Sequence, residues 1–187
     1  MNSVDRRENI IKLLLDSNEP IKGSVIAKEH LVTRQVIVKD IAILRAKGEN
    51  IIATPDGYII NKQENKVKAI IAVTHNEKEM FNEMSIVIKY GGTIEDVIVE
   101  HPLYGEITAM LMIKNYNELN KFVQKYQDQK ARLLSVLTNG VHIHTISAES
   151  EDDIKLIVSE LKENNFIVPY LENYERVTAG AFARSFF

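Results

Sequence analysis

The chain of 187 residues contains no cysteine, no tryptophan and only four prolines. Without cysteine it can form no disulfide and offers no thiolate to a metal, so any bound ion needs His, Asp or Glu ligands. No apolar run approaches the roughly 18 residues that span a bilayer, and polar residues follow Met1 where a signal peptide would be apolar. We therefore expect a cytoplasmic protein with no membrane partner.

The charges are divided unevenly along the chain, whose formal net charge is −3. Residues 1–66 contain 11 Lys and Arg against 9 Asp and Glu, a net charge of +2. Residues 67–187 contain 12 against 17, a net charge of −5. A weakly basic region followed by an acidic one indicates two parts with different partners.

Three short helices are predicted in the first fifty residues. The first covers residues 6–16, where apolar residues recur at helical spacing. The second runs from Ser24, a suitable N-cap, to about Leu31. The third begins at the cap Thr33 and ends at Gly48, a typical residue after the last helical turn. Its predicted buried stripe consists of Ile37, Ile41 and Leu44.

The segment IIATPDGYII at 51–60 predicts two strands joined by a tight turn. Three helices followed by a hairpin are the order of a winged helix-turn-helix, whose second motif helix enters the major groove of DNA. We therefore expect the third helix to bind double-stranded operator DNA, with Arg34 contacting a base edge. The candidate DNA contacts are Thr33, Arg34 and Gln35 in the first turn and Lys39 one turn further on.

A small helical domain that contacts other proteins is the alternative interpretation of this region, with its polar residues as ordinary solvated surface. A winged helix also favours a homodimer, because two heads on two half-sites add affinity that one short helix cannot supply. The pattern does not indicate where the dimer interface lies.

After a polar stretch at 61–66, the pattern changes to alternating strands and helices. The expected strands are 67–74, 94–100, 107–113, 133–137, 141–146 and 166–168, and the expected helices are 76–90, 116–128 and 150–164. They predict an α/β sandwich with helices on one mixed or antiparallel sheet, so the whole chain is α+β. The expected domains are a winged helix-turn-helix at 1–61, a second domain at 67–171 and a tail without assigned function at 172–187.

Four of the five histidines lie in the second half of the chain, at His75, His101, His142 and His144. The last two are the most informative, because residues two apart on a strand point to the same face about 6.5 to 7 Å apart. Both imidazoles can then bind one ion. Two half-exposed strand histidines without a ligand are the alternative, and the pair alone does not decide between them.

Four strings of the sequence together resemble a known family. They are TRQVIVKDIAILRAKG at 33–48, AVTHNEKEMFNEM at 72–84, EHPLYGE at 100–106 and GVHIHT at 140–145. The first also resembles the recognition helices of DeoR-like and biotin-repressor-like heads. In order and spacing, the four resemble niacin-responsive transcription repressors whose sensor is called the three-histidine (3H) domain. The resemblance covers nearly the whole chain.

The resemblance implies a repressor, not an enzyme, that uses nicotinic acid as corepressor to control niacin uptake and NAD synthesis genes. It also implies a divalent transition metal, for which nickel or zinc suits imidazole and carboxylate donors. The implied metal ligands are His75, Glu83, His142 and His144. On its own, Glu83 would be assigned to the solvated face of an acid-rich helix.

His101 and Tyr104 are expected near the organic ligand, in a turn where the backbone can approach it closely. Two other functions compete with a niacin-responsive repressor. A metal-dependent hydrolase lacks a visible HExxH motif or comparable general base and leaves the winged helix unexplained. A metalloregulator in which the ion itself is the effector is the alternative to a niacin sensor.

Overall fold

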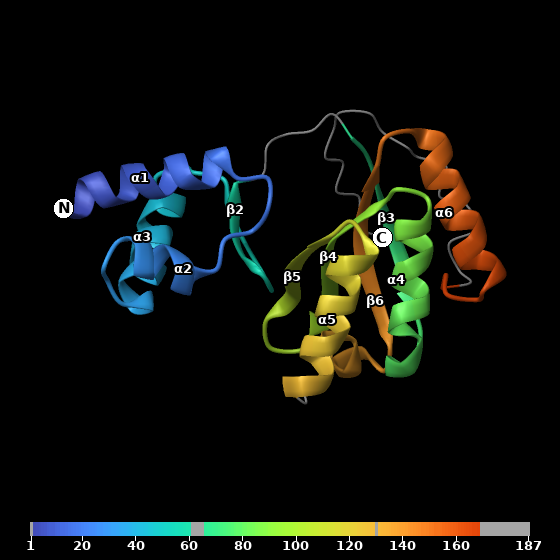
Figure 1. Ribbon diagram of the computed structural model, residues 1–187. Coiled ribbons are helices and arrows are strands. Elements are labelled where there is room, and N and C mark those ends of the chain that lie inside the picture. The colour runs from blue at the N-terminus through green and yellow to red at the C-terminus, as the bar shows by residue number, and fades with distance from the viewer. Residues whose placement is uncertain (1, 61–65, 130, 169–187) are drawn as a thin grey trace. The chain divides into compact units, whose positions relative to one another are not determined.

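The structure is a computed structural model that describes residues 2–60, 66–129 and 131–168 (Figure 1). The chain forms two compact units, residues 1–64 and 65–187. We call the described part of the first unit the head and that of the second unit the sheet domain. No helix within these described ranges is long and apolar enough to cross a membrane.

The head has the predicted order of three helices and a two-stranded hairpin (Figure 1). Its elements are α1 (Ser3–Asp16), α2 (Gly23–Glu29), α3 (Arg34–Ala46), β1 (Ile51–Thr54) and β2 (Gly57–Ile60). Helix α1 begins earlier than predicted because the Asn2 side chain accepts hydrogen bonds from the N–H groups of Val4 and Asp5. This N-cap satisfies donors that the helix itself leaves free.

One predicted cap in the head is wrong, a second residue lies at its predicted N-cap position, and one terminus is confirmed. Ser24 lies inside α2 and is not its N-cap, while Thr33 occupies the N-cap position of α3 without a capping bond from its side chain. Gly48 follows α3 with φ +98°. The N–H groups of Gly48 and the next residue donate to the carbonyls of Arg45 and Leu44 at 3.0 and 3.1 Å. This pair of bonds is a Schellman motif, which favours glycine.

The core of the head is aliphatic and contains the predicted stripe of α3. Its buried members are Ile10, Leu14, Ile26, Ala27, Ile37, Ile41, Leu44 and Ile51. One acid is also buried there, because Asp40 of α3 is 2% exposed. Its carboxylate accepts hydrogen bonds from Arg6 at 2.6 Å and Arg7 at 3.2 Å, which joins α1 to α3.

The sheet domain is built on a four-stranded sheet in the order β3-β6-β4-β5, with every neighbouring pair antiparallel. Of the two predicted kinds of sheet, mixed or antiparallel, the structure has the antiparallel one. The strands are β3 (Val67–Thr74), β4 (Thr93–His101), β5 (Gly105–Ile113) and β6 (Val141–Ala148). The helices are η1 (Glu77–Glu79), α4 (Met80–Lys89), α5 (Tyr116–Gln129), η2 (Leu134–Thr138) and α6 (Glu151–Glu163), where η marks a 3-10 helix.

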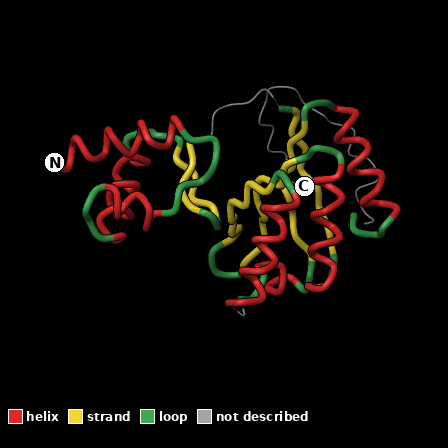
Figure 2. Tube along the Cα trace, viewed as in Figure 1, coloured by secondary structure: helices red, strands yellow, loops and turns green. Residues whose placement is uncertain are grey.

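Helices α4, α5 and α6 pack on one face of this sheet, with α4 in contact with both others (Figures 1 and 2). The core lies between these layers and joins Ile71, Val73 and Ile146 of the strands to Met84 and Ile157 of the helices. Side chains alternate between faces along a strand, so every second residue of β3 and β6 points to this core. That alternation directs two of the histidines inward.

One predicted strand is wrong, because residues 134–138 form the 3-10 helix η2. The Gly140 N–H donates to the Ser135 carbonyl at 2.8 Å, and Asn139 adopts a left-handed conformation with φ +53°, so the segment closes as a turn. A short apolar run carries no periodicity that separates these structures. The predicted strand at 166–168 is a single bridge between Val73 and Ile167. Residues 61–65 of the linker predicted at 61–66, and the whole predicted tail at 172–187, lie outside the described residues.

Candidate metal centre and nucleic-acid interface

Strand β6 places His142 and His144 on the core face of the sheet, two residues apart. They are 4% and 3% exposed, so they are not the half-exposed strand histidines of the alternative interpretation. Their ring centroids are 4.8 Å apart. In the antiparallel register with β3, His142 lies opposite Val73 and His144 opposite Ile71. Two imidazoles therefore stand side by side beneath the helices.

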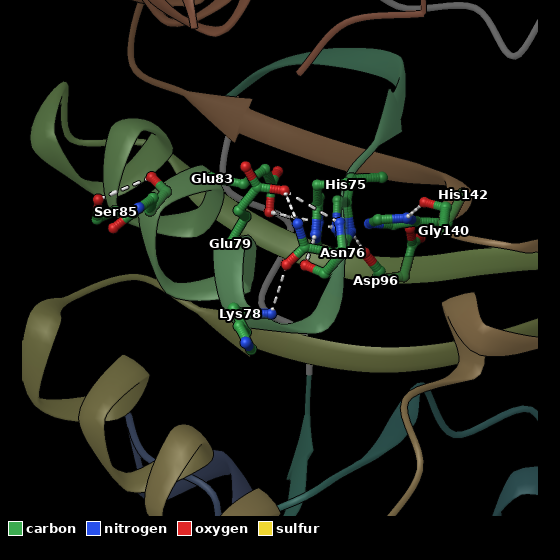
Figure 3. A network of polar contacts seen from close by, with 11 residues as sticks. His75, Asn76, Lys78, Glu79, Glu83, Ser85, Asp96, Gly140 and His142 are labelled. Carbon is green, nitrogen blue, oxygen red and sulfur yellow. Dashed lines mark hydrogen bonds and ion pairs between the residues drawn. The ribbon is translucent and has the colours of Figure 1, made fainter. Parts of the chain in front are cut away.

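His75 and Glu83 reach the same place from the segment that follows β3. Asn76 and Glu79 form a capping box that starts η1, and α4 continues from it. Glu83 lies on the side of α4 that faces the sheet and is 0% exposed, so its assignment to a solvated helix face is wrong. Figure 3 shows Glu83 pointing from α4 toward His75, with His142 and its partner Gly140 beyond.

The four predicted metal ligands form one cluster in the structure. Ligand atoms of His75, Glu83 and His142 all lie within 4.8 Å of one another. His144 lies outside that set of three, but its Nε2 is 3.8 Å from the Glu83 Oε2. The His75 Nε2 is 4.0 Å from the same oxygen. Glu83 thus lies within 4.0 Å of a histidine from each of two separate segments.

The three histidines share one tautomer. His75 Nδ1 lies 2.8 Å from the Asn76 carbonyl, His142 Nδ1 lies 2.9 Å from the Gly140 carbonyl, and His144 Nδ1 contacts the Asp96 carbonyl. A carbonyl oxygen only accepts hydrogen bonds, so each Nδ1 must carry the hydrogen. In this arrangement Nε2 is the ring nitrogen left to bind a metal, as in protein histidines that bind metals.

Polar atoms in the cluster are buried without a partner. Within the part of the chain that the structure describes, the His75 Nε2 and both carboxylate oxygens of Glu83 are inaccessible to solvent and make no hydrogen bond. Buried polar atoms are nearly always paired, so an orphaned set at one place requires an explanation. Three imidazole nitrogens and a carboxylate are donors that suit a first-row divalent ion. The residues present therefore fit a metal.

Burial shifts the protonation of the cluster away from its ionic form. It raises the pKa of Glu83 to about 8, because desolvation penalises the carboxylate. Burial also lowers the pKa of His142 to about 4 and that of His144 to about 3, because desolvation penalises the positively charged imidazolium. At neutral pH, without a cation, the acid retains its proton and both strand imidazoles are neutral.

Gly140 positions two of these histidines, a role that the sequence did not indicate. Its carbonyl accepts from the His142 ring at 2.9 Å and from the His75 backbone N–H at 3.4 Å. Its φ is +94°, and a Cβ placed there would lie 2.4 Å from the His75 carbonyl oxygen. Only glycine fits such an approach without displacing the backbone. The glycine of GVHIHT was the available sign.

His101 and Tyr104 form a separate group at the β4–β5 hairpin. The His101 Nδ1 accepts from the N–H groups of Leu103 and Tyr104 at 3.2 and 3.3 Å. The two rings lie 4.9 Å apart, and Tyr104 is 70% exposed. Over the described ranges, no hydrogen bond or ring contact joins either residue to the four-residue cluster. The structure thus brings together the predicted metal ligands but not these two residues.

The predicted DNA contacts lie on the exposed surface of the head. Thr33, Arg34, Gln35 and Lys39 are all exposed, while Ile37, Ile41 and Leu44 on the opposite side of α3 are buried. The only acid on α3, Asp40, is buried and paired. The charged groups that α3 exposes are therefore all cationic. They are Arg34, Lys39 and Arg45.

Comparison with known proteins places both units. Residues 68–170 match the model of the 3H domain, and residues 6–59 match a model of the HTH domain. This chain belongs to the 3H-domain transcription repressors. It is 42% identical over 164 residues to the "Probable transcription repressor NiaR" of Thermotoga maritima, covering 88% of this chain and 94% of that protein. It is 36% identical over 168 residues to the "Transcription repressor NadR" of Bacillus subtilis, covering 88% and 93%.

The membership confirms several predictions made from the sequence. The family, the head with its helix-turn-helix, the 3H domain and the α+β class are as expected. Both relatives are named as transcription repressors, which supports the prediction of a repressor rather than an enzyme.

Proposed function

We propose that this 3H-domain repressor senses nicotinic acid as a corepressor and represses niacin uptake and NAD synthesis genes when the acid is abundant. The observation that carries the proposal is the buried cluster of three histidines and Glu83, whose unpartnered donors lie in a domain attached to a DNA-binding head. A regulator needs such a built site to convert the presence of a small molecule into a change in DNA affinity.

His75, Glu83, His142 and His144 would hold a divalent transition ion, for which nickel and zinc are the candidates. A bound ion supplies a positive centre in a region whose net charge is otherwise −5 (residues 67–187), and that centre can attract a ligand carboxylate. We place nicotinic acid beside it, with His101 and Tyr104 nearby. Nicotinamide lacks the charge, so it should bind much more weakly.

The proposed DNA contacts are Thr33, Arg34, Gln35 and Lys39. The repressor would act in the cytoplasm as a homodimer, whose two heads occupy two half-sites of the operator. The proposed domains are the winged helix-turn-helix at 1–61 and the sensor domain at 67–171. Nicotinic acid must bind the conformation that binds DNA more tightly than the conformation that does not. A ligand with equal affinity for both conformations would leave the equilibrium between them unchanged.

The test is binding of the full-length protein to duplexes from the promoters that it controls, with four additions: nickel, nickel with nicotinic acid, nickel with nicotinamide, and nicotinic acid after chelation. We expect tight binding only with nickel and nicotinic acid together. The His101→Ala protein should keep its ion and lose part of the response.

Two results would redirect the proposal. Equal tightening with nickel alone would make the ion itself the effector, as in the metalloregulator alternative. Equal tightening by nicotinic acid after complete chelation would make the metal structural. Repeating the series with zinc separates the two candidate ions.

A further inference from the structure

Val38 lies on the cationic surface of the recognition helix and has no explained role in the head. It is 44% exposed, whereas the stripe residues of the same helix are buried. About one helical turn separates it from Arg34 and from Ala42, and Gln35 is three residues before it, so these are its neighbours on the helix surface. Arg34 and Gln35 are polar, and Ala42 adds little apolar area.

From this placement we infer that Val38 contacts the methyl group of a thymine in the major groove and thereby specifies a T·A pair in the operator. The inference rests on the proposed function, in which α3 enters that groove. The charged side chains that α3 exposes around Val38 are all cationic. Such a surface is complementary to the phosphates of duplex DNA.

The chemistry of valine limits what it can recognise. Its side chain has no donor or acceptor, so it cannot read the hydrogen-bonding pattern of a base edge. The thymine methyl is the apolar feature that base pairs present in the major groove. A β-branched residue in a helix also has one strongly preferred rotamer, so Val38 presents its methyl groups in a fixed direction.

Burying one methyl group against another surface changes affinity by about fourfold, which is about 0.8 kcal/mol at 1.4 kcal/mol per tenfold. The effect is smaller than that of a bidentate hydrogen-bonded contact, so it must be isolated by removing each methyl group separately.

The experiment begins by selecting duplexes from a random-sequence pool with the full-length protein, nickel and nicotinic acid, and in parallel with nickel alone. Each thymine of the enriched half-site is then replaced by deoxyuridine, which lacks only the 5-methyl group. We expect one replacement to weaken binding of the unaltered protein about fourfold. The Val38→Ala protein should bind about fourfold more weakly to the thymine duplex and show no further loss at that position.

Val25→Ala is the matched control, because Val25 is 52% exposed on α2 of the same head and loses the same two methyl groups. This variant should keep the full fourfold response to deoxyuridine. If every deoxyuridine replacement has the same effect on the unaltered and Val38→Ala proteins, the inference is wrong although DNA binding stands. If no sequence is enriched under either condition, the repressor function fails and the inference fails with it.

Discussion

Asp40 is the buried acid of the head and Glu83 is the most deeply buried acid of the sheet domain, and their surroundings are opposite. Asp40 is 2% exposed and is held by two arginines of α1, whereas Glu83 is 0% exposed and both its oxygens lack a partner. A fully paired buried acid fixes two helices against each other. An unpaired one opposes folding and is expected only where a ligand completes the site. Asp40 is thus an acid with partners, and Glu83 is the unpartnered acid that we propose as a metal ligand.

The largest expected effect is on the structural side of this comparison. Asp40→Ala should destabilise the head by about 3 kcal/mol, because it leaves Arg6 and Arg7 clustered without their anion. Denaturation of the full chain, with hydrogen exchange followed in α1 and α3, measures the change. Asp16→Ala removes an exposed acid from the same helical region and should stay within about 0.5 kcal/mol. A loss below about 1 kcal/mol for Asp40→Ala would contradict the structural role.

In the cluster around Glu83, His142→Ala and His144→Ala should each weaken nickel or zinc binding by more than about 100-fold. Loss of a residue that only hydrogen-bonds to a metal ligand usually has a smaller effect on metal affinity. The measurement is metal content of the purified proteins together with titration calorimetry. Gly140→Ala should give an intermediate loss, since it moves the carbonyl that orients His142. Stoichiometric metal in both histidine variants would remove the pair from the ligand set.

Glu83→Met should act with the opposite sign to Asp40→Ala in metal-free protein. Replacing an unpaired buried acid by an apolar residue of similar size should stabilise the fold by roughly 1 to 3 kcal/mol at pH 8. The same variant should lose the ion. Destabilisation of the metal-free protein would show that Glu83 has a structural partner.

The pH dependence sharpens this result. The pKa of Glu83 rises from 4.5 to about 8 on folding, so the unfolded chain ionises first and stability should fall as pH rises through that interval. The pKa values of His142 and His144 fall from 6.5 to about 4 and 3, so the unfolded chain gains protons first and stability should fall as pH drops below 6.5. Metal-free protein should be most stable near pH 6.5, and Glu83→Met should lose the alkaline decline.

The smallest expected effects concern the exposed surface of α3, where neither burial nor pairing operates. Arg34→Ala should cost about 1 to 3 kcal/mol on the selected duplex and relax its sequence preference, because a base contact is lost. Lys39→Ala should weaken all duplexes alike and reduce the salt dependence, as expected for a phosphate contact. Competition binding at several salt concentrations distinguishes them. Equal losses on specific and nonspecific DNA for both variants would contradict the assignment.

Much of the fold follows from local sequence. The stripe of Ile37, Ile41 and Leu44, the stop at Gly48 and strand β3 all lie where the patterns predict them. These features depend on side-chain period and on backbone preferences that a short segment carries by itself. The segment 134–138 was predicted incorrectly because a short apolar run has the same composition as a strand, and its turn is closed by bonds to residues outside the run.

The sequence by itself determined most of the elements, the cationic character of α3 and the placing of His142 and His144 on one face of a strand. It could not decide the fate of either buried acid. Asp40 meets Arg6 and Arg7 across 34 and 33 residues, and Glu83 meets the β6 histidines only because α4 packs over that strand. Burial and pairing are properties of contacts between distant segments, so the tertiary structure alone decided which carboxylate is structural and which is free to bind an ion.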